Sequence, residues 1–280
     1  MPGHSKLFIK LQNATYIYPG TENPVLREIN NNINAGEFIA VIGPNGSGKS
    51  TLARLIAGLL IPSGGHVLVD GMDTGLPSNS KKIRRQVGLV LQNPDNQLVA
   101  AVVEEDVAFG PENLGLPSAE VRRRVEEALA AVGLSQMRSR PPHMLSGGEK
   151  QRLAIAGLLA LHPLCVVLDE PTSMLDPVGR QEVVQVLRHL ADTGTAVVLI
   201  THHMDEAASA DRVWALGRGG LLADAEPEVV FSQVKLLHDL GLTLTNTGEL
   251  ARCMTERGFE LPTGIVTMED MVEYLCRVLK

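Results

Sequence analysis

The chain has 280 residues, of which 44% are hydrophobic, and a formal net charge of −7. This length suffices for one large hydrophobic core with a small appendage, and the acidic balance argues against a dominant polyanion-binding face, so we expect no nucleic-acid partner. The apolar runs fall far short of the roughly 18 to 20 residues that span a bilayer, and the N-terminal MPGHSKLF lacks the apolar segment of a secretory signal.

Apolar strands alternate with helices along most of the chain. The stretch LFIKLQNATYIYP alternates apolar and polar residues, which predicts an early strand with a bulge near Asn13. Further strands are predicted at 37–43, 66–70, 86–91, 164–170 and 196–201, and helices at 49–60, 118–132, 148–162 and 177–191. This order is typical of a mostly parallel sheet with helices on both faces.

The pattern changes after about residue 235, where the sequence predicts two helices and no convincing strand. The last helix starts with a capping box, Thr267 to Asp270. Its apolar positions share one helical face; they are Met268, Met271, Val272, Leu275, Val278 and Leu279. This face must pack either on the chain's own core domain or on a second subunit, and the sequence leaves both alternatives open.

Three cysteines, Cys165, Cys253 and Cys276, are widely spaced and match no metal-ligand pattern. Cys165 lies inside an apolar run. We therefore expect buried or incidental thiols in a reducing compartment.

The segment GPNGSGKST fits the pattern G-x-x-x-x-G-K-[ST] and lies between a predicted strand and a predicted helix, which is the context this P-loop motif requires. Its backbone N–H groups and the helix N-terminus are expected to bind the phosphates of ATP. The predicted nucleotide-binding residues here are Gly43, Asn45, Gly46, Ser47, Gly48, Lys49, Ser50 and Thr51. Lys49 is expected to contact the β- and γ-phosphates, and Ser50 to ligate Mg²⁺.

Two carboxylates end the buried strand CVVLDE. Asp169 is expected to hold Mg²⁺ through its water shell, and Glu170 to orient the attacking water at the sheet edge where ligands bind in open α/β folds. His202 ends another buried strand at the same edge. A lone histidine is more often structural, but this position favours a contact with the γ-phosphate.

The segment LSGGEKQRLAIA places a serine and two glycines at a helix start, which is a further anion site without its own lysine. Since the P-loop already holds the nucleotide, we expect this site to contact the γ-phosphate bound by a second subunit. With this motif the chain resembles the ATP-binding cassette ATPases over about residues 5–235. The resemblance implies an α/β P-loop NTPase fold with a RecA-like core, an antiparallel β subdomain and a helical subdomain at about 93–160. The change of pattern after residue 235 adds a small α-helical C-terminal domain at 236–280.

The same resemblance implies roles for further residues. Tyr18 would stack on adenine, Gln92 would join the Mg²⁺ shell, and Asp176 would end the D-loop. Three signature residues would act on the partner's nucleotide, and His202 would be the switch histidine. The signature residues are Ser146, Gly147 and Gly148. Glu149 stands where many members have glutamine, and we expect little effect.

Four segments are similar to the ATP-binding subunits of energy-coupling factor transporters; they are QNPDNQ, EEDVAFGPENLGLP, DEPTSMLDP and LPTGIVTMEDMVEYL. In this family the ATPase often occurs as two paralogues, and the segments GTENP, DGMDT and SMLDP are more similar to the first of them. The resemblance implies uptake of vitamins or transition-metal ions such as cobalt and nickel. It also implies a second ATPase subunit, identical or paralogous, a membrane coupling (T) subunit and a substrate-binding (S) membrane subunit, and thus a peripheral location on the cytoplasmic face of the membrane.

Two alternative functions remain open at this point. One is the ATPase of an ordinary ABC importer, which more often carries a β-rich tail. The other is a non-transport cassette ATPase in DNA repair or translation. The acidic residues of and after QNPDNQ are interpreted either as partners of arginines on a membrane subunit or as solvated acids; they are Asp95, Glu104, Glu105 and Asp106. The basic clusters around Lys81 and at 122–124 are interpreted as solvated helix faces or partners of nearby glutamates.

Overall fold

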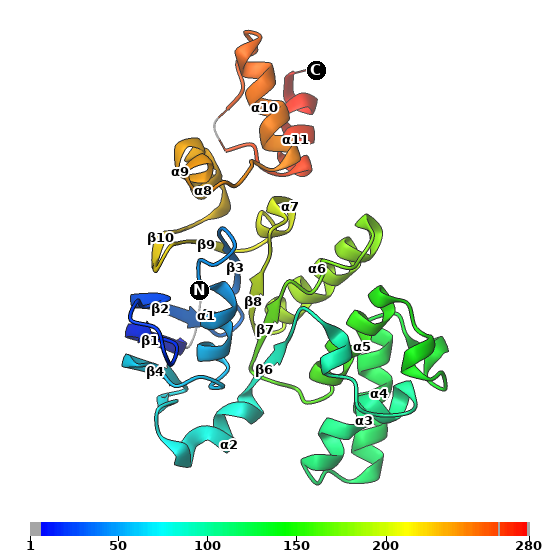
Figure 1. Ribbon diagram of the computed structural model, residues 1–280. Coiled ribbons are helices and arrows are strands. Elements are labelled where there is room, and N and C mark those ends of the chain that lie inside the picture. The colour runs from blue at the N-terminus through cyan, green and yellow to red at the C-terminus, as the bar shows by residue number, and fades with distance from the viewer. Residues whose placement is uncertain (1–6, 263, 279–280) are drawn as a thin grey trace, which may run out of the picture.

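The computed structural model describes residues 7–262 and 264–278 and contains two β-sheets with helices around them (Figure 1). The strands are β1 (Leu7–Tyr16), β2 (Leu26–Asn34), β3 (Phe38–Ile42), β4 (Gly64–Val69), β5 (Met72–Asp73), β6 (Val87–Val90), β7 (Cys165–Asp169), β8 (Ala196–Ile200), β9 (Arg212–Gly217) and β10 (Gly220–Ala225). The helices of the first part of the chain are α1 (Lys49–Ile56), α2 (Pro77–Gln86), the 3₁₀ turn η1 (Pro94–Asn96), α3 (Val103–Asn113), α4 (Ser118–Ala131), η2 (Ser135–Met137), η3 (Pro142–Met144) and α5 (Gly147–Leu159). The later helices are α6 (Pro177–Asp192), α7 (Met204–Ala207), α8 (Pro227–Ser232), α9 (Val234–Asp239), α10 (Asn246–Glu256) and α11 (Met268–Val278).

The six-stranded sheet has the order β10-β9-β3-β8-β7-β6, and every neighbouring pair except β9–β10 is parallel. Its central strands β3, β7 and β8 are buried at every position. Because successive side chains alternate between faces, Ile39 and Val41 pack with α1 and the smaller sheet, whereas Phe38 and Ala40 pack with the core shared by α5 and α6. The expected parallel sheet with helices on both faces is confirmed.

The four-stranded sheet is antiparallel, with the order β2-β1-β4-β5. The predicted bulge is present: the register of β1 shifts between Leu11 and Ala14, and Asn13 has φ 48°. Strand β2 was not predicted from the sequence. Its buried residues Leu26, Ile29 and Ile33 do not alternate, because Glu28 has φ 47° and breaks the period of two.

Helices α3, α4 and α5 form one layer beside the sheet edge, at the lower right of Figure 1. Helix α5 starts with a complete capping box: the Ser146 side chain accepts from the Glu149 N–H, and the Glu149 carboxylate accepts from the Ser146 N–H at 2.7 Å. Glu149 therefore stabilises the start of this helix.

The chain ends in helices α8 to α11, at the top of Figure 1. The predicted capping box of α11 is confirmed, since Asp270 accepts from the Thr267 N–H at 2.7 Å and donates its own N–H to the Thr267 hydroxyl at 3.2 Å. Of the predicted apolar face, Met271 is buried, whereas Met268, Val272 and Val278 are exposed; Leu279 lies outside the described residues. Within 7–262 and 264–278, no helix has both the length and the apolar character to cross a bilayer.

Candidate functional site

The P-loop turn connects β3 to α1 and contains two positions, Gly43 and Gly48, that only glycine can occupy. Gly43 has φ 153°, and a Cβ there would lie 2.3 Å from the Leu216 carbonyl oxygen. Gly48 has φ 100°, and its Cβ would lie 2.7 Å from Leu26. Asn45 and Gly46 form the exposed tip of the turn. A glycine-rich turn of this kind at the start of a helix is the arrangement that binds phosphate.

Lys49 and Ser47 are buried under this turn. The Lys49 ammonium donates to the Gly43 carbonyl at 2.7 Å and to the Pro44 carbonyl at 3.1 Å. Burial lowers the pKa of Lys49, and the charges of Glu170 and Asp169 oppose this shift. The Ser47 hydroxyl is buried without a hydrogen-bond partner in the described part of the chain, so a phosphate oxygen would satisfy it.

Ser50 and Asp169 come together from α1 and the end of β7. Burial raises the pKa of Asp169, while the neighbouring Ser50 hydroxyl and the charges of Arg54 and Lys49 lower it. A hydroxyl and a carboxylate in contact are oxygen donors of the kind that Mg²⁺ prefers.

Glu170 connects the ends of three strands. The Gln92 amide, just after β6, donates to Glu170 Oε2 at 2.8 Å, and His202 Nδ1, after β8, lies 3.5 Å from the same oxygen. The Glu170 backbone has φ 50°, a conformation that costs about 1 to 3 kcal/mol for a non-glycine residue and that occurs often at functional sites. Its N–H donates to the Ile200 carbonyl at 3.0 Å, which holds this conformation.

The remaining predicted site residues lie around this cluster or on the exposed surface. The Tyr18 hydroxyl contacts the Thr51 hydroxyl at 3.0 Å, so its ring is fixed beside the start of α1. Ser146 and Gly147 are exposed at the start of α5, and Gly148 is half-buried. Asp176 is exposed and caps α6 by accepting from the Gly179 N–H at 2.9 Å.

Sequence reasoning missed a buried carboxylate, Glu206, which joins two of these strand ends. It accepts from the Thr172 hydroxyl, after β7, and from the Thr201 hydroxyl, after β8, each at 2.6 Å. Thr201 in turn accepts from the His203 N–H at 3.0 Å. Glu206 therefore fixes the loops that present Glu170 and His202. No local pattern indicates this role, because Thr172 and Glu206 are 34 residues apart.

Comparison with known proteins places this geometry in a family. The family model described as ABC transporter matches residues 26–173. The energy-coupling factor transporter ATP-binding protein EcfA1 of Caldanaerobacter subterraneus is 50% identical, over 96% of this chain and 99% of the relative. The EcfA1 protein of Symbiobacterium thermophilum is 56% identical, over 88% of this chain and 86% of the relative.

The chain belongs to the ATP-binding subunits of energy-coupling factor transporters.

Solved structures agree with this assignment. The structure of cbiO1 from Clostridium perfringens, part of the ABC transporter complex cbiONQ, has a TM-score of 0.76 and 36% identity, and covers 88% of this chain and 99% of its own. A dimeric structure of the ATP-binding cassette MJ0796, bound to ADP and Pi, has a TM-score of 0.72 and 33% identity, with 78% of this chain and 98% of its own covered. The fold class inferred from the sequence is thereby confirmed.

The acidic residues near the QNPDNQ segment of this energy-coupling factor ATPase have partners within the chain. Asp95 forms an ion pair with Lys150 at 2.8 Å, and Glu104 forms one with Arg138 at 2.7 Å. Asp106 is buried and accepts from two backbone N–H groups of 99–100. The interpretation as a solvated acid is therefore wrong for Asp106, whereas Asp95 and Glu104 form ion pairs at the solvent-accessible surface. The basic residues 122–124 do pair with nearby glutamates, as expected, through Arg123 and Arg124.

We predict that Glu206→Ala lowers the free energy of unfolding by about 2 to 4 kcal/mol, because it leaves the buried Thr172 and Thr201 hydroxyls without an acceptor. The measurement is urea unfolding followed by circular dichroism. Glu112→Ala, an exposed glutamate of α3, is the control and should change stability by less than about 0.5 kcal/mol. Equal stability of the two variants would show that Glu206 does not hold these loops.

Proposed function

We propose that this chain is the ATP-hydrolysing subunit of an energy-coupling factor importer, and that it works in an ATPase dimer at the cytoplasmic face of the membrane. The observation that carries the proposal is the cluster of Gln92, Glu170 and His202 beside the P-loop. We assign residues 5–235 to the ATP-binding domain, with a helical subdomain at about 93–160, and 236–280 to a C-terminal helical domain. Residues 5, 6, 263, 279 and 280 lie outside the described residues.

ATP would bind with its phosphates on the P-loop turn and its adenine against Tyr18, whose ring is held by the Thr51 hydroxyl. Ser50, Asp169 and Gln92 are the residues that would hold Mg²⁺, Asp169 through water. When bound, Mg²⁺ would neutralise charge on the β- and γ-phosphates. The fit is supported by the proximity of the Ser50 hydroxyl to the Asp169 carboxylate, since both supply oxygen ligands of the kind that Mg²⁺ prefers.

Glu170 would orient and polarise the water that attacks the γ-phosphate. The Gln92 amide fixes one carboxylate oxygen, and the backbone conformation of Glu170 fixes where the side chain begins. His202, on the other side of Glu170, would contact the γ-phosphate. Phosphoryl transfer depends mainly on positioning and charge neutralisation, so few further groups are required from this chain.

The exposed start of α5 would act on the nucleotide of a second ATPase chain, an identical copy or a paralogue. Ser146, Gly147 and Gly148 offer a hydroxyl and helix N–H groups to a γ-phosphate, and Asp176 lies at the exposed start of α6. ATP bound between two chains favours the closed dimer because only that state makes both sets of contacts. Hydrolysis removes this bridging ligand, and the dimer opens.

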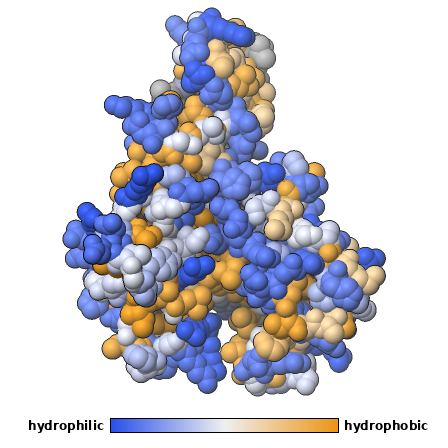
Figure 2. All heavy atoms as spheres, in the orientation of Figure 1, coloured by the Kyte–Doolittle hydropathy of each residue, from blue (hydrophilic) through white to orange (hydrophobic). Residues whose placement is uncertain are grey.

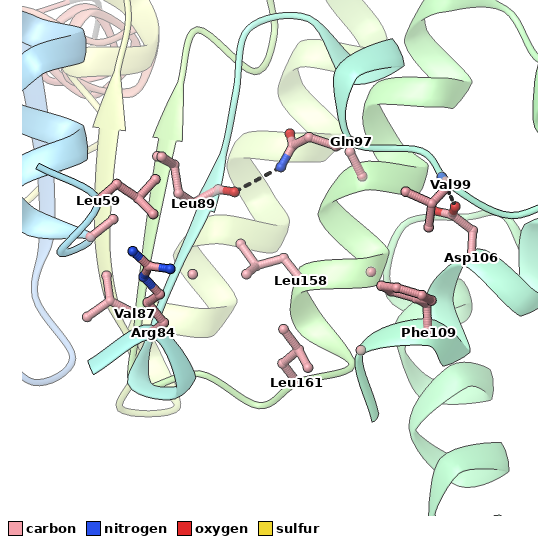
Figure 3. A pocket seen from close by; sticks show the side chains of 15 residues that line it. Leu59, Arg84, Val87, Leu89, Gln97, Val99, Asp106, Phe109, Leu158 and Leu161 are labelled. Atoms are coloured by element: carbon pink, nitrogen blue, oxygen red, sulfur yellow. Dashed lines mark hydrogen bonds between the residues drawn. The ribbon is translucent and has the colours of Figure 1, made fainter. Parts of the chain in front are cut away.

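A groove between the sheet edge and the α3–α5 layer would receive a helix of the membrane coupling (T) subunit, which in turn contacts the substrate-binding (S) subunit. The groove has a volume of about 350 Å³ and contains Leu89, Phe109 and Leu158 (Figure 3). Phe109 is 53% exposed although it is a large apolar residue. Figure 2 shows apolar residues along the hollow between the two lower lobes of the molecule. Exposed apolar surface in a groove is typical of an interaction site.

We predict that Glu170→Gln binds ATP with the parental affinity but hydrolyses it at least about a hundredfold more slowly, because the amide cannot polarise the attacking water. The measurement is steady-state phosphate release together with ATP affinity. Glu182→Gln, an exposed glutamate of α6, is the control and should hydrolyse ATP at the parental rate. Hydrolysis by Glu170→Gln at the parental rate would overturn the assignment.

We predict that Phe109→Glu reduces copurification with the membrane subunits by about tenfold or more, because a charge replaces an apolar contact in the groove. Phe259→Glu is the matched control, since Phe259 is equally exposed, at 57%, but lies in the C-terminal part. Each variant is coexpressed with the membrane subunits and quantified after affinity purification. Unchanged recovery of Phe109→Glu would exclude this groove as the docking site.

A further inference from the structure

Strand β6 is the edge strand of the six-stranded sheet, and within the described residues it pairs with β7 alone. The outward-facing N–H and C=O groups of such a strand need other partners. Among the outward-facing groups of β6 and the residue after it are the Leu89 carbonyl and the N–H and C=O of Leu91. This edge leads directly to Gln92.

The side-chain amide of Gln97 takes the place of a neighbouring strand at this edge. Its Nε2 donates to the Leu89 carbonyl at 3.0 Å, as Figure 3 shows, and its Oε1 accepts from the Leu91 N–H at 2.8 Å. In a parallel ladder, one residue of a neighbouring strand bonds in the same way to the residues before and after its counterpart, here Val90. The side chain of Gln97 thus makes the two hydrogen bonds that one residue of a further parallel strand would make with β6.

A second glutamine holds the next outward group. Gln151 of α5 is 1% exposed, and its Nε2 donates to the Leu91 carbonyl at 3.5 Å. The Leu91 N–H and C=O are therefore bound by two side chains from the α3–α5 layer and the turn that leads to it. Gln151 lies in α5, whose N-cap is Ser146. Helix α5 therefore connects the exposed Ser146 to the Leu91 carbonyl that Gln151 binds.

We propose that Gln97 is a positioning residue for ATP hydrolysis. Gln97 binds the Leu91 N–H and thereby positions the next residue, Gln92, to donate its hydrogen bond to Glu170. Gln151 assists by binding the Leu91 carbonyl. Gln97 also lies on the wall of the groove formed by Leu89 and Phe109, so a helix bound there contacts the residue that positions Gln92. The inference rests on the proposed function, because it needs Gln92 and Glu170 to act on ATP.

The test is a double-mutant cycle on the full chain in its ATPase dimer. Gln97→Met keeps the length and apolar contacts of the side chain and removes both hydrogen bonds. Alone, it is expected to lower kcat about tenfold with little change in KM for ATP, since misplaced catalytic groups slow the chemical step. In a Gln92→Ala background the same change is expected to have almost no further effect, because Gln97 acts through Gln92.

Gln151→Leu serves as a second variant in the same cycle, and Gln233→Met, at an exposed glutamine between α8 and α9, is the control. Folding of every variant is checked by circular dichroism and ATP affinity. An equal reduction by Gln97→Met in both backgrounds, or no reduction in either, would overturn the inference. If Glu170→Gln also hydrolysed ATP normally, the proposed function itself would be wrong; if Glu170→Gln were inactive, only the role of Gln97 would be lost.

Discussion

The hydrogen bond from Gln92 to Glu170 joins the two parts of the molecule that hydrolysis requires. Glu170 follows β7, in the buried sheet beside the P-loop, whereas Gln92 begins the segment that leads into the α3–α5 layer. The parallel sheet makes this contact possible, because β6, β7 and β8 end at the same edge. If Gln92 and Glu170 act as proposed, a rotation of the α3–α5 layer relative to the sheet that broke this bond would slow hydrolysis.

Polar side chains link the segments that follow these strand ends. Glu206 joins the segments after β7 and β8, and Gln97 joins the edge of β6 to the helical layer. A further contact reaches the C-terminal part: Asp205, in α7, accepts from the Asn246 N–H and side-chain amide at the start of α10. The C-terminal helices are therefore bonded to the helix that follows His202. Of these contacts, the two bonds of Glu206 are buried, and buried hydrogen bonds of this kind hold one arrangement in place when every member is paired.

Much of this site could be predicted from the sequence because its motifs are local. The P-loop and the strand-end pair Asp169–Glu170 combine residue type with a predictable strand or helix within a few positions. Glu206 and Gln97 could not be found in this way. Their hydrogen-bond partners come close only after the strands have paired and the chain has turned back on itself. A single glutamate or glutamine in the sequence does not indicate such a partner. The same holds for β2, because its asparagine-rich sequence and the positive φ at Glu28 remove the regular alternation that would predict a strand.

The central claim is that each ATP is hydrolysed by Glu170 of one chain while the α5 start of the other chain holds it. ATP hydrolysis by dimers purified through a different tag on each chain tests this directly. With Ser146→Arg in one chain and the catalytic glutamate changed to Gln in the other, one complete site remains, and about half of the parental rate is expected. With both changes in the same chain, neither site is complete, and hydrolysis should be lost. Retention of half the rate in that second dimer would contradict the account.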